Sequence, residues 1–185
     1  MKRRTFITSG LLQFGGLVSL AGLAGSCSES CAHGSKGQIL YAGAGEVYYI
    51  GNRRKAKVTI KISKASDPCT PMSLLSEIIP PGDYIPVHQH LNEDEFIFIY
   101  RGNASVFVEH EEQEMLPGDL AFIPRKKWHG LKNKGNEYVH MIFGYSPAGF
   151  EDYFRAIGTK SIKDKTNLSP EAWEETSKKY GVIYR

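Results

Sequence analysis

The sequence has few cysteines and almost no net charge, and each shortage argues against a class of protein. Its 185 residues include three cysteines, too few for a fold held together by a disulfide framework. The 23 basic residues exceed the 20 acidic ones only because of Lys2, Arg3 and Arg4, so the charges balance from Cys27 onward. Binding to nucleic acid needs an uncompensated basic face, so we expect no nucleic-acid partner. The length predicts one domain with appendages and disfavours a two-domain enzyme.

Charged residues are also absent from Thr5 to Ser28, directly after the basic start. A basic start, an uncharged stretch and small residues ahead of Cys27 predict an export signal over residues 1–26. A membrane-spanning helix is the alternative, but frequent glycine, serine and glutamine leave the stretch only weakly apolar. The run from Arg3 to Ile7 resembles a twin-arginine signal peptide. The protein is therefore expected to be exported.

The cysteines bear on where the exported protein resides. Residues 23–27 resemble a bacterial lipoprotein box, which implies lipidation of Cys27 and a possible lipid tether to a membrane; plain secretion into the periplasm is the alternative. Residues 27–37 are expected to form a flexible tether. Cys31 and Cys69 could pair in an oxidising compartment. Because Cys31 falls in a tether that imposes no geometry, we expect no structural disulfide.

Short strand patterns recur over residues 38–146, each bounded by Gly, Pro, Asn or Asp. Strands are expected at residues 46–50, 56–63, 72–79, 96–100, 104–110, 120–123 and 138–144. No helical pattern separates these runs, so we predict an all-β fold, an antiparallel double-sheet sandwich or barrel. Helical patterns appear only in residues 147–157 and in a segment capped by Ser169, so residues 147–185 are expected to form a C-terminal helical extension.

Histidines in the middle of the chain have the spacing of a metal site. In a strand, side chains two residues apart share a face, so His88 and His90 can chelate one ion. A short turn then lets Glu95 head the next strand, and a turn at Pro124 leads to His129. Ordinary surface histidines on alternating strands are the alternative. Imidazole and carboxylate donors suit one divalent ion of Fe, Mn, Ni, Co, Cu or Zn, and the sequence does not name which.

These residues resemble the paired motifs of the cupin superfamily. The first motif is matched by Gly82, His88, His90, Glu95 and Gly102, and the second by Gly118, Pro124, His129 and Asn133. The departure is Lys126, where the cupin pattern has glycine; it affects the form of a turn and not a ligand. The resemblance implies a jelly-roll barrel that holds the metal with His88, His90, Glu95 and His129.

The C-terminal stretches 147–158 and 168–182 look like the tails of small single-domain cupins similar to quercetin 2,3-dioxygenase. That resemblance implies an O2-dependent oxygenase of a small enol or phenolic compound, with Glu95 as both metal ligand and general base. The residues that could line the substrate pocket are Tyr84, Trp128, His140 and Phe143. A metal-dependent isomerase or lyase of a small sugar acid, and a non-enzymatic module that binds a small ligand or metal, stay open. The expected partner is a small-molecule substrate, and a homodimer is also open.

Overall fold

The structure is a computed structural model that describes residues 37–50, 56–164 and 168–185. The expected export signal, the tether, Cys27 and Cys31 lie outside these residues. In chain order the elements are β1(Glu46–Ile50), β2(Ala56–Ile62), β3(Ser73–Ile79), β4(Tyr84–His90), β5(Asp94–Arg101), β6(Ala104–Val108), β7(Glu111–Met115), β8(Leu120–Ile123), β9(His129–Lys132), β10(Val139–Ser146), α1(Glu151–Ile157), α2(Pro170–Lys179) and β11(Val182–Tyr184).

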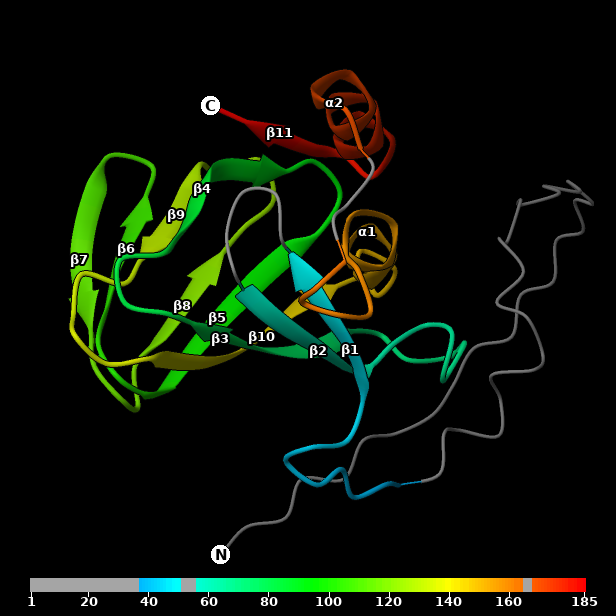
Figure 1. Cartoon of the computed structure of the whole chain (residues 1–185), viewed down its shortest axis with the longest axis horizontal. Coiled ribbons are helices and arrows are strands. Elements are labelled where there is room, and N and C mark those ends of the chain that lie inside the picture. Colours follow the sequence, from blue (N-terminus) through cyan, green and yellow to red (C-terminus); the bar gives the residue numbers. More distant parts are fainter. Residues whose placement is uncertain (1–36, 51–55, 165–167) are drawn as a thin grey trace, which may run out of the picture.

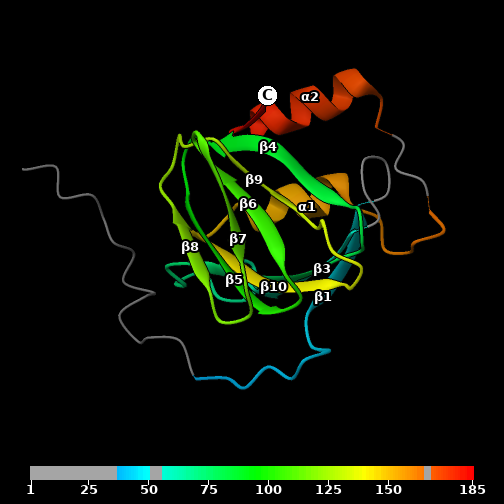
Figure 2. The ribbon, with the colours of Figure 1, turned by 90° about the vertical axis from the view of Figure 1, so that its left-hand side faces the viewer.

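The strands form two antiparallel sheets that face each other (Figures 1 and 2). One sheet has six strands in the order β1-β2-β3-β10-β5-β8, and the other has five in the order β11-β4-β9-β6-β7. Burial alternates along the central strands β3, β5 and β10, so every second side chain points into the space between the sheets. The predicted double-sheet jelly-roll is therefore confirmed.

Besides the four-residue strand β9, two strands escaped the sequence analysis. In β7 four of five side chains are exposed and three are glutamates, so the strand shows no apolar alternation. It is an edge strand, and it forms because Ala104 to Val108 of β6 pair along its whole length. The other, β11, has three residues and is too short for any periodicity to be read; its pairing with β4 forms it.

The two C-terminal helices lie on the same side of the barrel (Figure 1). The predicted cap of α2 is present, since the Ser169 hydroxyl accepts a hydrogen bond from the Ala172 amide at 3.2 Å. Phe154 and Ile157 of α1 and Trp173 of α2 are buried, so both helices pack on the barrel through apolar side chains. Within the described residues, no helix has the length and apolar character needed to cross a membrane.

Cys69 is disulfide-bonded, contrary to the expectation from the sequence. The other cysteines of the chain, Cys27 and Cys31, lie outside the described residues. The expectation rested on the lack of fixed geometry in the tether. A disulfide requires only that two thiols meet in the right orientation.

Candidate metal centre

The four predicted ligands meet inside the barrel. His88 and His90 lie on the inward face of β4, Glu95 is near the start of β5, and His129 begins β9. Their relative exposures lie between 1% and 7%. One ligand atom from each of the four lies within 4.8 Å of all the others. Side chains far apart in the sequence thus form one buried group of three imidazoles and one carboxylate that could hold a metal ion.

The turn that carries His129 toward the others keeps its form despite the departure at Lys126. This residue has φ of 66°, in the left-handed region that glycine adopts most easily. Its amide donates to the carbonyl of His90 at 2.6 Å, which ties the turn to the ligand strand. Lysine therefore takes a left-handed backbone conformation that suits glycine, at a cost in strain.

Two other motif positions have structural roles. A Cβ atom on Gly102 would stand 2.5 Å from the carbonyl oxygen of Tyr138, so only glycine fits there without displacement. The buried amide of Asn133 donates to the carbonyls of Ile79 and Glu137 and accepts from the amide of Gly135, at 2.8 to 3.0 Å. Neither residue touches the ligand group, and each holds a turn of the barrel.

Backbone carbonyls set the orientation of two of the imidazoles. His88 Nδ1 lies 2.8 Å from the carbonyl oxygen of Pro86, and His129 Nδ1 lies 2.9 Å from that of Lys127. A carbonyl only accepts, so each Nδ1 carries the hydrogen and donates it. In the neutral imidazole this leaves a lone pair on Nε2, the tautomer in which a histidine binds a metal through Nε2.

The Nε2 atoms and the carboxylate converge. His88 Nε2 lies 3.2 Å from His90 Nε2. Glu95 Oε2 lies 3.1 Å from His90 Nε2 and 2.8 Å from His129 Nε2. Lone pairs that point at one another at these distances repel unless a proton or a cation lies between the donor atoms. Adjacent ligands of an octahedral ion with bonds of about 2.1 Å are about 3.0 Å apart, so these separations fit a bound divalent ion.

The protonation states also suit metal ligands. Burial raises the pKa of Glu95, but hydrogen bonds and charges from His129 and His90 outweigh it and hold that pKa well below its ordinary value. Burial lowers the pKa of His88 well below its ordinary value, and the neighbouring imidazoles lower it further. Burial also lowers the pKa of His129, but the hydrogen bond to Glu95 outweighs it and the net shift is upward. Glu95 is thus a carboxylate at neutral pH, and His88 is a neutral imidazole.

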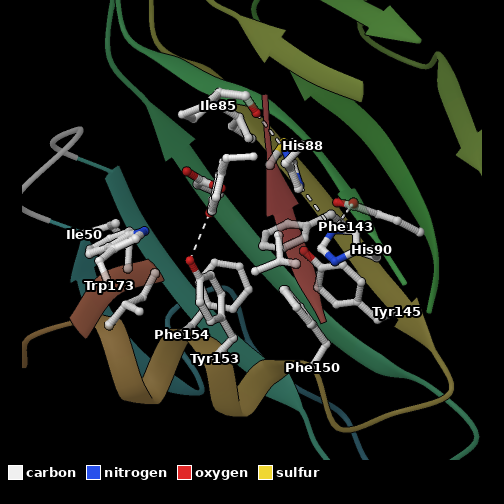
Figure 3. Close-up of a pocket in the computed structure, with 17 residues that line it drawn as sticks. Ile50, Ile85, His88, His90, Phe143, Tyr145, Phe150, Tyr153, Phe154 and Trp173 are labelled. Atoms are coloured by element: carbon white, nitrogen blue, oxygen red, sulfur yellow. Dashed lines mark hydrogen bonds and ion pairs between the residues drawn. The ribbon is translucent and has the colours of Figure 1, made fainter. Parts of the chain in front are cut away.

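The ligand group forms part of the wall of an internal chamber of about 40 Å³. Figure 3 shows His88 and His90 beside this chamber, whose walls include the rings of Phe143, Tyr145, Phe150, Phe154 and Trp173. Sites for drug-sized ligands measure about 300–1,000 Å³, so this chamber is small. It is an enclosed, largely aromatic space with metal-type donors in its wall.

Of the expected pocket residues, Phe143 lines the chamber, whereas the structure places Tyr84, Trp128 and His140 elsewhere. The pairing of β4 with β9 shifts register between Ile85 and His88, so Ile85 lines the chamber and Tyr84 is exposed. His140 alternates with the buried Val139 and Met141, so it points outward, where it contacts the Tyr100 ring. Trp128, next to His129, is half-buried and does not line the chamber.

Sequence reasoning missed the C-terminal part of the chamber wall. Tyr153, Trp173, Val182 and Tyr184 line it, and so does the buried Glu77 of β3. The alternating pattern of β3 could have placed Glu77 on the inward face. No comparable signal existed for Tyr184, because its strand has only three residues.

Comparison with known proteins agrees with this architecture. The Cupin domain model matches residues 75–145. An uncharacterized protein of Methanocaldococcus jannaschii is 31% identical over 81 residues, which are 43% of this chain and 65% of that protein. Quercetin 2,3-dioxygenase of Bacillus subtilis is 28% identical over 79 residues, which are 43% of this chain and 23% of that enzyme. The chain therefore spans less than two thirds of either relative.

A solved structure, KdgF from Halomonas sp., is similar with a TM-score of 0.53 and 19% sequence identity. The similarity covers 63% of this chain and 99% of that one, and at this identity it bears on the fold alone. The two sheets, the buried group of three histidines and one glutamate and the match to the family model agree. Residues 75–145 of this chain thus match the Cupin domain model and lie within a jelly-roll barrel.

Proposed function

We propose that the protein is a metal-dependent oxygenase that acts on a small enol or phenolic compound. The observation that carries the proposal is the buried group of four donors, three of which, His88, His90 and Glu95, lie in the wall of a largely aromatic chamber. Four protein ligands leave one or two positions on a five- or six-coordinate ion, as catalysis requires. A redox-active ion held there would supply the oxygen chemistry and a contact for the substrate oxygen.

The residues of the chain have separate roles in this proposal. His88, His90 and His129 hold the ion, and the carbonyls of Pro86 and Lys127 keep two of the rings oriented. Glu95 is ionised, so its carboxylate can accept the hydroxyl proton of the enol or phenol. The aromatic walls exclude water and pack against a flat, uncharged ligand.

The same walls disfavour the sugar-acid alternative. A carboxylate or a polyol loses its hydration when it enters an apolar chamber. Hydrogen bonds from the protein must offset this desolvation cost, and phenylalanine rings do not offer them. Phe143, Phe150 and Phe154 form part of the wall. The similarity to quercetin 2,3-dioxygenase, over 23% of that enzyme, also favours an oxygenase.

The test measures metal content and O2 uptake with a panel of small enols and phenols. We expect O2 consumption in proportion to substrate and no turnover without O2. Glu95→Gln, which keeps an oxygen donor but loses the base, should retain measurable metal and lower turnover by about 10²- to 10⁴-fold. Glu175→Gln, a charge change at an exposed position on α2, is the control and should leave turnover unchanged.

Three results would contradict the proposal. The first is a protein that holds only zinc, because zinc has no redox chemistry. The second is turnover that proceeds unchanged without oxygen, which would point to an isomerase or lyase. The third is a Glu95→Gln variant that matches wild type, which would remove the carboxylate from the reaction. A binding module would show neither turnover nor O2 uptake.

A further inference from the structure

The chamber is completed by a segment outside the matched cupin domain. The family match ends at residue 145, whereas Trp173, Val182 and Tyr184 of the C-terminal segment line the chamber. The ligand group thus belongs to the matched domain, whereas this part of the wall is an addition to that domain from the C-terminal segment. A wall outside the matched domain, beside a metal-type site, is a place where ligand selectivity can arise.

The addition is attached directly to the strand that carries two of the candidate ligands. In the pairing of β11 with β4, Tyr184 stands opposite His88 and Val182 opposite His90. Backbone hydrogen bonds extend this pairing at both ends, from Leu91 to Gly181 at 2.8 Å and from Arg185 to Val87 at 3.0 Å. The ring centroids of Tyr184 and His88 are 5.7 Å apart. Tyr184 therefore forms the wall next to a ligand.

A directed series of hydrogen bonds holds the Tyr184 ring in place. The Ser177 hydroxyl donates to the carbonyl of Trp173 at 2.8 Å. Each hydroxyl has one hydrogen, so Tyr153 must donate to Ser177 at 3.0 Å, and Tyr184 must donate to Tyr153 at 3.0 Å. Any swing of the Tyr184 ring out of the chamber would break this series. The ring is a fixed wall and not a loose side chain.

We propose that Tyr184 sets the upper size of the ligand, limiting it to an enol or phenol more compact than a substituted catechol. The chamber measures about 40 Å³, and Tyr184 is the C-terminal aromatic side chain opposite a ligand histidine. This inference rests on the proposed metal site. It makes Tyr184 a specificity-determining residue, and binding of a substituted catechol or a larger compound is disfavoured while the Tyr184 ring stays in place.

The experiment uses the full chain loaded with cobalt, whose visible spectrum reports binding at the ion. The two probes are azide, which is small, and 4-nitrocatechol, which is bulky for this chamber. Tyr184→Ala should bind 4-nitrocatechol about tenfold or more tightly than wild type, the scale of relieving one steric overlap. Azide binding should stay within about twofold, because azide does not need the space.

Three further variants separate size from other effects. Tyr184→Phe keeps the ring but loses the hydrogen bond to Tyr153, so it should bind azide like wild type and 4-nitrocatechol more weakly than Tyr184→Ala does. Ile183→Ala alters the neighbouring residue of β11, whose side chain is exposed and does not line the chamber, and it controls for loosening of the strand. Tyr184→Leu, a smaller truncation that keeps an apolar side chain, should shift 4-nitrocatechol affinity in the same direction as alanine if the alanine variant folds poorly.

The outcomes distinguish this inference from the proposed function. If wild type binds cobalt and 4-nitrocatechol binds equally to wild type, Tyr184→Leu and Tyr184→Ala, the size limit is wrong and the metal site stands. An equal gain in Ile183→Ala would assign the effect to the strand and also overturn the inference. If cobalt does not bind at His88, His90, Glu95 and His129, the proposed function fails and this inference fails with it.

Discussion

Replacing Lys126 with glycine should stabilise the protein, because Lys126 is held in a backbone conformation that suits glycine. Its φ is 66°, and its side chain is exposed. A residue with a Cβ atom loses about 1–2 kcal/mol in this region. Glycine removes that strain but costs about 0.5–1 kcal/mol more in backbone entropy. The net gain should therefore be about 0.5–1 kcal/mol.

Thermal and urea denaturation of metal-free protein measure this change. A gain of 1 kcal/mol raises the Tm of a domain of this size by about 2–4 °C. Lys126→Ala is the matched control, because it removes the same side chain and keeps the strained backbone, and its stability should stay near that of wild type. Metal affinity should not change in either variant, since the amide of residue 126 can still donate to the carbonyl of His90.

The reasoning would be refuted if the glycine and alanine variants had equal stability. Equal values would mean that the turn carries no strain at this position. A glycine variant less stable than wild type would mean that the entropy of the unfolded chain outweighs the strain. Weaker metal binding in the glycine variant alone would show that the rigidity of this turn contributes to the ligand geometry.

Three other changes have definite expected results. Chelator should lower the Tm of wild type, because a bound ion at a hundredfold excess over its Kd adds about 2.7 kcal/mol to the free energy of unfolding. Chelator should leave the Tm of the His88→Ala/His90→Ala double variant unchanged; an equal response of both proteins would place the metal elsewhere. Asn133→Ala should cost about 3 kcal/mol in urea denaturation, because buried backbone groups lose their partners; a loss below about 1 kcal/mol would contradict its structural role. Hydrogen bonds from Arg125 lower the pKa of Asp94 to about 2. The stability that this pair contributes should be complete above the ordinary pKa of 3.8 and fall as the pH drops toward 2. In Arg125→Ala the pKa of Asp94, followed by carboxyl NMR titration, should rise toward its ordinary value but stay below it, because the backbone amide of residue 125 still donates to the carboxylate; an unchanged titration would exclude the Arg125 side chain as the cause.

The features of the fold and the site that depend on local backbone geometry could be predicted from the sequence. Side chains two residues apart in a strand must share a face, so His88 and His90 could be paired without any tertiary information. The alternating strands and the Ser169 cap could be predicted for the same reason, because the signals are local. The export signal and lipidation at Cys27 stay predictions, since they lie outside the described residues.

Spacing alone did not determine the chamber around the candidate ligands. Tyr84 was expected to line it, but the pairing of β4 with β9 shifts register between Ile85 and His88, and Tyr84 is exposed. Cys69 forms a disulfide that no local sequence pattern predicted.

Only the tertiary structure decided which residues form the wall of the chamber beside the candidate ligands. Tyr184 lies nearly a hundred residues from His88 in the sequence and meets it only because β11 pairs with β4. The three-residue strand has no periodicity of its own, and the edge that it covers is created by the rest of the barrel. The sequence by itself determined which side chains could bind an ion. The long-range pairing of strands decided which side chains enclose the space beside them, because a contact between distant segments depends on the whole sheet.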